Sequence, residues 1–419
     1  MAHARFSPSA AHRWIPCPGS MILEKDIANT SSVHADEGTA AHFLASECLE
    51  RDRNATDFLN CFIVVKNGNA AWDNENAETR TGFCVDLEMS ENVQKYLDAV
   101  RSQADGNELL IEQRVNFSNF IDAENAFGTG DAIIIGQSEI QVHDLKYGRG
   151  VKVDAENNEQ LKLYALGALS DFGMFGDFTQ VRLVIHQPRL NHVSESVVSI
   201  EDLYDFAHRA KNTVQMIKAI DAGAAIFEAK DMLNPGEKQC HWCKAKATCP
   251  ALIEHVIETV AGEFDDLSTC DLEAEIKQAV EDVPQHENQL LAKLYAALPL
   301  IESWSKAVAE AVSSKLHSGE QVPGYKLVQG RAGNRTWANA EDAEQVLKGM
   351  RLKVEEMYDL KLISPTNAEK LQKAGVIGPR QWTKVQDLIV RPEGKPTVAH
   401  ESDKRPALDI NPLNDFDTV

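Results

Sequence analysis

The feature that most constrains the fold is a change in hydrophobic period that begins at Glu108. Three consecutive segments, ELLIEQRVNF, FGTGDAIIIG and EIQVHDLKYG, are rich in Ile and Val and are separated by Gly, Asn and Ser. This pattern is typical of strands joined by short turns. A helical segment follows over residues 156–173, and two further strand-like segments come after it. The order predicts a compact α/β unit with a mixed sheet.

The residues before this unit follow helical spacing. The first predicted helix is short, with Ser7 as its cap and Pro8 in its first turn. A second helix is predicted over residues 35–52 and a third over roughly Val85 to Ala104. A polar loop that contains Trp72 is expected between these two helices.

We expect the chain to divide into four parts. The core unit spans residues 1–265, a helical arm spans 266–320, and a small C-terminal α+β module spans 321–397. Residues 398–419 contain Pro and Asp and are poor in aromatic side chains, so we expect a disordered tail.

The charge of the chain limits what kind of partner it can bind. A formal net charge of −22 argues against a protein that binds DNA by general electrostatic attraction, because Lys and Arg supply the affinity for phosphate. Residues 322–400 carry more Lys and Arg than Asp and Glu, so a local basic surface remains compatible with DNA. No signal-like segment and no long apolar run occurs, so we expect a cytoplasmic protein that does not enter a membrane.

Two carboxylates and a lysine lie on the second and third predicted strands. Asp131 follows G-x-G on one strand, and Asp144 and Lys146 form D-x-K on the next. A hairpin would bring both carboxylates to one end of the sheet, where they suit Mg²⁺ or Mn²⁺. Lys146 shares a strand face with Asp144, so its ammonium can orient water or offset phosphate charge. The alternative is a surface hairpin with ordinary charges.

Three residues on predicted helices are further candidates. His42 lies beside small residues in GTAAHFLASECLE, where a metal-binding imidazole could approach the sheet. Gln160 and Tyr164 are four residues apart and share a helix face that can point toward the sheet end. Taken singly, each of the three is more often an ordinary surface or core residue.

Three cysteines are clustered as C-x2-C-x5-C at Cys240, Cys243 and Cys249. Cys17, between two prolines, is the candidate for a fourth ligand. A set of cysteine ligands favours either zinc or an iron–sulfur cluster. The remaining cysteines are scattered and are expected to be packing residues: Cys48, Cys61, Cys84 and Cys270.

The motifs G-x-x-x-H, G-x-x-D, D-x-K and Q-x-x-x-Y occur in this order between Gly38 and Tyr164. Together they resemble the RecB-like branch of the PD-(D/E)XK nucleases. The resemblance implies a restriction-endonuclease-like core, in which a mixed sheet is flanked by helices. It assigns the catalytic Mg²⁺ or Mn²⁺ to four positions: His42, Asp131, Asp144 and the Leu145 carbonyl. Lys146 would be the catalytic lysine.

Further roles follow from the same resemblance. Gln160 and Tyr164 would contact DNA or support the site, and Glu112 lies where relatives often carry an acidic residue. One early cysteine and three late ones are similar to the [4Fe–4S] staple of AddB-type and CRISPR-adaptation nucleases. This implies that Cys17 completes an iron–sulfur cluster that clasps the first helix to the region after the core, with Zn²⁺ as the alternative. His241 and Trp242 would shield it.

The chain as a whole resembles a phage- or prophage-borne group of RecB-like proteins. The resemblance implies a metal-dependent exonuclease that acts on DNA ends during recombination in a bacterial host cell, in association with single-strand annealing proteins. Two alternatives remain open: a nuclease-like DNA-binding or assembly protein without turnover, and a structure-specific endonuclease. Relatives include ring-forming homo-oligomers and monomers, so the motifs leave the oligomeric state open.

The C-terminal module carries weaker candidates. Arg331, Arg335 and Trp337 could contact phosphates and stack on a base. A small domain with solvated charges explains these residues equally well.

Overall fold

The computed structural model describes residues 4–27, 33–73, 82–261, 288–326 and 364–386, together with a few single positions between 277 and 389. The chain divides into two units, Met1–Leu327 and Val328–Val419. The sheets, both candidate sites and every element up to the long helix α12 belong to the first unit.

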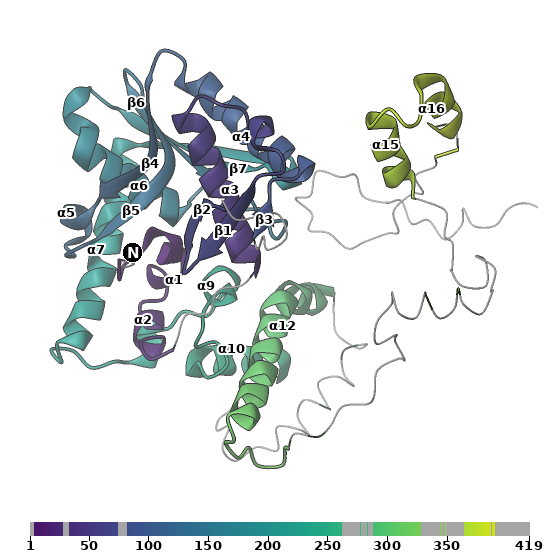
Figure 1. Ribbon diagram of the computed structural model, residues 1–419. Coiled ribbons are helices and arrows are strands. Elements are labelled where there is room, and N and C mark those ends of the chain that lie inside the picture. Colours follow the sequence, from purple (N-terminus) through teal and green to yellow (C-terminus); the bar gives the residue numbers. More distant parts are fainter. Residues whose placement is uncertain are drawn as a thin grey trace, which may run out of the picture. The chain divides into compact units, whose positions relative to one another are not determined.

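A five-stranded mixed sheet forms the centre of the first unit (Figure 1). Its strands follow the order β4-β5-β6-β7-β8, and only β6 and β7 run parallel. The bounds are β4 Glu108–Asn116, β5 Phe127–Ile135, β6 Glu139–Leu145, β7 Gln180–Gln187 and β8 His192–Ser199. Parallel neighbours need a crossover, and helix α6 (Glu159–Phe172) supplies it between β6 and β7. The predicted α/β unit with a mixed sheet is confirmed.

One face of the sheet is covered by α6, by α7 (Ile200–Asp221) and by the N-terminal elements η1 (Pro8–Ala10) and α1 (Ala11–Trp14). Helix α6 lies so close to β4 that a Cβ at Gly167 would come 2.8 Å from the Val115 side chain. The short N-terminal helix occurs as predicted, with Pro8 in its first turn, but the Ser7 side chain does not cap it.

The opposite face is covered by α3 (Val33–Glu50) and α4 (Leu87–Ala104). Ala132 packs into this second core and its neighbour Ile133 packs into the first, because successive strand residues point to opposite faces. Helices therefore cover both faces of the sheet (Figure 1).

A second, three-stranded sheet lies beside α3 and was not predicted. Its order is β2-β1-β3, with bounds β1 Phe62–Lys66, β2 Asn69–Trp72 and β3 Phe83–Cys84. The predicted polar loop is therefore wrong. Trp72 stacks on Phe58, with ring centroids 5.0 Å apart, and donates a hydrogen bond to Glu47 at 2.7 Å. The Asn67-Gly68 turn, with φ angles of 52° and 73°, is a local hairpin signal that was overlooked, and these contacts add to it.

The remaining elements are mostly helices. In the first unit they are α2 Ser20–Leu23, η2 Ala55–Phe58, α5 Ser118–Ile121, η3 Gly173–Phe175, η4 Pro188–Leu190, α8 Ala229–Met232, α9 Glu237–His241, α10 Pro250–Ala261 and α12 Asn288–His317. The second unit contains α15 Pro365–Lys373 and α16 Pro379–Gln386. No helix in the described part of the chain has the length and apolar character needed to cross a membrane. The predicted tail, 398–419, lies outside the described residues.

Candidate functional site

The β5–β6 hairpin brings Asp131 and Asp144 to the same end of the sheet. Ala132 pairs with His143, and the two aspartates come one residue further from the hairpin turn on their strands. The main-chain N–H of Leu145 donates a hydrogen bond of 2.7 Å to Asp131 Oδ2. Strand pairing therefore fixes both carboxylates.

His42 approaches Asp131 from helix α3. Its Nδ1 lies 3.2 Å from Asp131 Oδ1, and buried Ala41 and Ala45 let the helix pack closely. Although desolvation disfavours the imidazolium, the Asp131 carboxylate raises the pKa of His42 to about 9. In turn, burial disfavours the Asp131 carboxylate, but His42 and the Leu145 N–H hold the pKa of Asp131 below its ordinary value. The pair is a compensated charge pair when no ion is bound.

Glu112 on β4 completes a group of three possible ligands. One ligand atom each of His42, Glu112 and Asp131 lies within 4.8 Å of the others. Glu112 has a left-handed backbone (φ 46°), which is uncommon inside a strand and frequent at functional sites. Desolvation and the neighbouring Asp131 raise the pKa of Glu112 to about 7. An imidazole with two carboxylates is a donor set that fits Mg²⁺ or Mn²⁺.

Asp144 faces a different partner from Asp131. Lys146 Nζ lies 2.8 Å from Asp144 Oδ2, and the Asp144 side chain is nearly fully buried. Burial raises the pKa of Asp144 although Lys146 opposes this. Desolvation disfavours the ammonium, but Asp144 raises the pKa of Lys146, which therefore keeps its proton at neutral pH. The resemblance had placed Asp144 among the ligands, whereas the structure groups Glu112 with His42 and Asp131.

Gln160 and Tyr164 on α6 join this pair in one network. Gln160 Oε1 accepts a hydrogen bond from Lys146 Nζ at 3.0 Å, and Gln160 Nε2 donates to Asp144 Oδ1 at 3.1 Å. Gln160 Nε2 also lies 3.0 Å from the Tyr164 hydroxyl. The predicted helix face therefore points to the D-x-K strand and holds the lysine in place.

Two features near the site were missed at the level of sequence. Tyr96 on α4 lines the same pocket as His42, Glu112, Asp131 and Leu145. Its position among apolar α4 residues marks only a buried helix face, so no sequence signal points to the pocket.

The second missed feature is a pair of buried histidines beneath the sheet end. His143 Nδ1 lies 3.0 Å from His186 Nε2, and His143 Nε2 lies 3.1 Å from Gln141 Oε1. Burial lowers the pKa of His143 to about 3 and that of His186 to about 4. Both rings are therefore neutral at pH 7.

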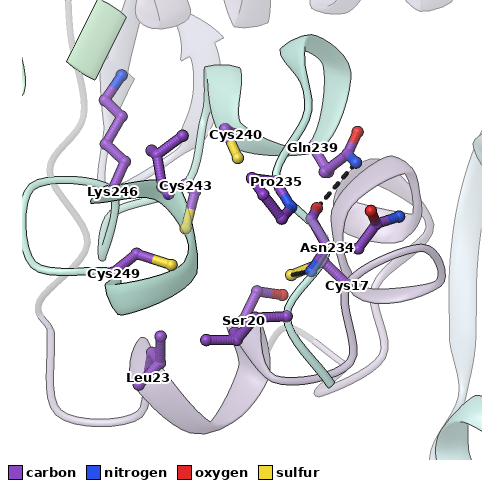
Figure 2. A pocket seen from close by; sticks show the side chains of 12 residues that line it. Cys17, Ser20, Leu23, Asn234, Pro235, Gln239, Cys240, Cys243, Lys246 and Cys249 are labelled. Carbon is purple, nitrogen blue, oxygen red and sulfur yellow. Dashed lines mark hydrogen bonds between the residues drawn. The ribbon is translucent and has the colours of Figure 1, made fainter. Parts of the chain in front are cut away.

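The four predicted cysteine ligands line one pocket, and their sulfur atoms point into it (Figure 2). The four are Cys17, Cys240, Cys243 and Cys249. Main-chain N–H groups point at two of the sulfurs: that of Asn234 at Cys17 Sγ and that of Gly236 at Cys240 Sγ, each at 3.4 Å. Burial raises the pKa of the Cys17 and Cys240 thiols, and that of Cys243 to about 12. Apolar neighbours and N–H donors together suit a buried group that carries thiolates.

A buried ion pair joins the two segments that carry these cysteines. Arg13 lies 3.0 Å from Glu24 Oε2 and donates a hydrogen bond to the Trp242 carbonyl, also at 3.0 Å. Glu24 Oε1 accepts from the Lys244 main-chain N–H at 2.7 Å. We call Arg13 and Glu24 the clasp. His241 packs edge-on against Trp242, but neither lines the pocket, and Trp242 is 68% exposed.

Several predicted positions lie outside the described residues. They are Arg331, Arg335, Trp337 and Cys270. Cys48, Cys61 and Cys84 are buried or partly buried away from the cysteine pocket, as expected for packing residues.

Residues 3–406, nearly the whole chain, match the family described as "Protein of unknown function (DUF2800)". The chain belongs to this family. The DUF2800 chain is also similar to a solved structure titled "Crystal structure of SSO0001". The identity is 15%, the match covers 55% of this chain and 92% of that chain, and the TM-score is 0.22. So low a similarity carries no argument, so the function of this DUF2800 protein has to be argued from its own site.

Proposed function

We propose that this DUF2800 protein is a Mg²⁺- or Mn²⁺-dependent deoxyribonuclease that hydrolyses phosphodiester bonds at DNA ends. The observation that carries the proposal is the close group of His42, Glu112 and Asp131 beside the ion pair of Lys146 with buried Asp144. An ion site next to a fixed ammonium is an arrangement that suits phosphodiester hydrolysis.

Each residue of the site has a distinct part in this reaction. A divalent ion, when bound, would lower the pKa of the attacking water and offset charge on the phosphate. His42, Glu112 and Asp131 would hold the ion with one nitrogen and two carboxylates. The ammonium of Lys146 would orient the water and stabilise the negative charge that develops on the phosphate.

Asp144 and Gln160 act on Lys146 rather than on the phosphate. Both hydrogen bond to Lys146 Nζ, so the ammonium is held before substrate arrives. A preorganised charge costs no rearrangement during the reaction, which is why such networks favour catalysis. Tyr164 supports Gln160 from the same helix face.

We further propose that the cysteine pocket holds a [4Fe–4S] cluster rather than zinc. Four thiolates about 2.3 Å from one tetrahedral zinc would lie within about 4 Å of one another. Among the described residues only the His42 group has three ligand atoms within 4.8 Å, so no three thiols come that close. Wider spacing favours a group larger than a single ion. Its role would be structural, since it joins Cys17 to the segment after the sheet.

One experiment tests the nuclease proposal and separates its alternatives. Linear duplexes labelled at the 5′ or 3′ end, and a closed circle, are incubated with Mg²⁺, Mn²⁺ or a chelator. We expect loss of end label from linear DNA only, and the labelled end that is lost first gives the polarity. Lys146→Ala should slow degradation by about 10³-fold, because a charge that stabilises the transition state is removed.

The matched control is Lys152→Ala, which removes an exposed lysine from the segment that follows. It should degrade DNA at the wild-type rate. Cutting of the circle would instead favour a structure-specific endonuclease. DNA binding without any degradation would favour the assembly protein. Degradation by Lys146→Ala at the wild-type rate would show that the assigned site is wrong.

A further inference from the structure

Tyr96 is a buried polar residue that lines the pocket of the proposed metal centre and has no role in it so far. It lies on α4, is 1% exposed, and lines the pocket together with His42, Glu112 and Asp131. Neither the D-x-K motif nor the proposed reaction uses it. Its hydroxyl is the polar part of a side chain that is otherwise packed in the core.

The Tyr96 hydroxyl has no hydrogen-bond partner among the residues that the structure describes. A buried hydroxyl without a partner loses its hydration and gains nothing, so native proteins rarely retain one. Ser90, on the same helix, is also buried without a partner, but it does not line the pocket. Tyr96 differs because it lines the pocket that carries the three possible ligands.

The ring of Tyr96 is held where it is. It packs edge-on against His186, with ring centroids 5.2 Å apart and an interplanar angle of 79°. His186 is itself tied to His143, and His143 to Gln141. This chain of contacts runs through β6 and β7, so the hydroxyl cannot easily turn away from the pocket.

The hydroxyl is a hydrogen-bond donor at neutral pH. Burial raises the pKa of Tyr96 well above its ordinary value, and the carboxylates of Asp131, Asp144 and Glu112 add to this effect. The hydroxyl bonds to none of these carboxylates in the described structure. An oxygen carried by the cation would supply the acceptor that it lacks.

We propose that the Tyr96 hydroxyl positions an oxygen ligand of the cation held by His42, Glu112 and Asp131. The oxygen comes either from water or from a phosphate group. This inference rests on the proposed metal centre, and it makes Tyr96 a positioning residue that acts through the ion's ligand. Groups of this kind typically change metal affinity by about 10- to 100-fold when removed.

The test compares Tyr96→Phe with Ser90→Ala, because both remove a buried, unpartnered hydroxyl from α4. Binding is measured by calorimetric titration, first with Mn²⁺ alone and then with Mn²⁺ and inorganic phosphate. The melting temperature of each metal-free protein is measured as well. We expect Tyr96→Phe to weaken Mn²⁺ binding about tenfold without lowering the metal-free melting temperature. Ser90→Ala should leave Mn²⁺ binding unchanged.

The outcomes distinguish water from phosphate as the source of the oxygen, and a positioning role of the Tyr96 hydroxyl from a structural one. Weaker binding with Mn²⁺ alone assigns the bond to water, and weaker binding only with phosphate present assigns it to a phosphate oxygen. Unchanged binding in both titrations overturns the proposal, as does a lower metal-free melting temperature, because the hydroxyl would then have a structural partner. Asp131→Asn serves as the reference: if it binds Mn²⁺ like the wild type, the metal centre itself is wrong.

Discussion

The carboxylate site and the cysteine pocket are held together in opposite ways. The first stands on strands of the central sheet, and its charges are compensated by protein groups: His42 with Asp131, and Lys146 with Asp144. The second is formed by short helices and turns around four buried cysteines, and burial raises the pKa of Cys17 and Cys243 among them. In the carboxylate site, these charged groups are paired with opposite charges of the protein. In the cysteine pocket, the charged thiolate form of the cysteines is favoured only when a metal is bound.

This difference in how the two sites are held together predicts which of them matters more for the stability of the protein. Strand pairing and two helix layers hold the carboxylate site whether or not an ion is present. The cysteine pocket joins its two segments through the Arg13–Glu24 clasp, a small apolar cluster and a few hydrogen bonds, such as that from the Gly19 N–H to the Met232 carbonyl. Substitutions in the sheet site should therefore change activity, and substitutions at the pocket should change stability first.

The largest stability effect is expected for Cys17→Ser. It removes a proposed ligand of the cluster and one link between the first helix and the segment after the sheet, so we expect a loss of more than about 3 kcal/mol. The variant should lose its iron, its absorbance at about 400 nm and most of its activity together. Metal analysis, absorbance and thermal unfolding check this.

Cys48→Ala is the matched control, since Cys48 is fully buried but lies away from the pocket. It should retain iron and lose about 1 kcal/mol from the small cavity. If Cys17→Ser keeps both its cluster and its stability, the contrast between the two sites fails. Stoichiometric zinc in a colourless wild-type protein would reject the cluster but keep the pocket as a metal site.

A smaller effect is expected for Arg13→Met. The Arg13 and Glu24 side chains are largely buried, so removal of one partner leaves an uncompensated charge that costs about 3 kcal/mol or less. The double variant Arg13→Met with Glu24→Met should recover part of that loss. Urea unfolding of the wild type, the two single variants and the double variant gives the coupling free energy between Arg13 and Glu24. Additive losses would show that the clasp does not join the two segments.

The sequence predicted the sheet because its signal is local. Ile- and Val-rich segments separated by turn residues mark β4, β5 and β6, and the D-x-K spacing places Lys146 beside Asp144. The cysteine set could likewise be predicted, because spacing along the chain limits which thiols can meet.

Other parts of the site depend on contacts between distant segments. The β1–β2 hairpin has a local signal in its Asn67-Gly68 turn, but the packing of Trp72 on Phe58 joins separate segments. The place of Glu112 beside His42 depends on an uncommon backbone conformation in β4. Tyr96 looks like any residue of an apolar helix face, since only the packing of α4 on the sheet brings its hydroxyl to the pocket.

The last predicted effect concerns the histidines beneath the sheet site and depends on pH. Burial lowers the pKa of His143 to about 3 and that of His186 to about 4. Below the unfolded value of about 6.5, the unfolded chain binds protons that the folded protein excludes. Stability from this source is therefore fully present above pH 6.5 and is lost as pH falls toward 4. Each histidine contributes about 1.4 kcal/mol per pH unit.

Asp131 raises the pKa of His42 to about 9, so His42 stays protonated in the folded protein throughout this window. Its contribution to the pH dependence is therefore the same in the wild type and in the variants compared below. Urea unfolding is measured at pH 7, 6 and 5. The double variant His143→Gln/His186→Gln should lose less unfolding free energy per pH unit than the wild type. His208→Gln, at an exposed position, should keep the wild-type slope. Equal slopes in all three proteins would mean that the buried pair takes up protons at the same pH as in the unfolded chain, and burial would then not keep the two rings neutral.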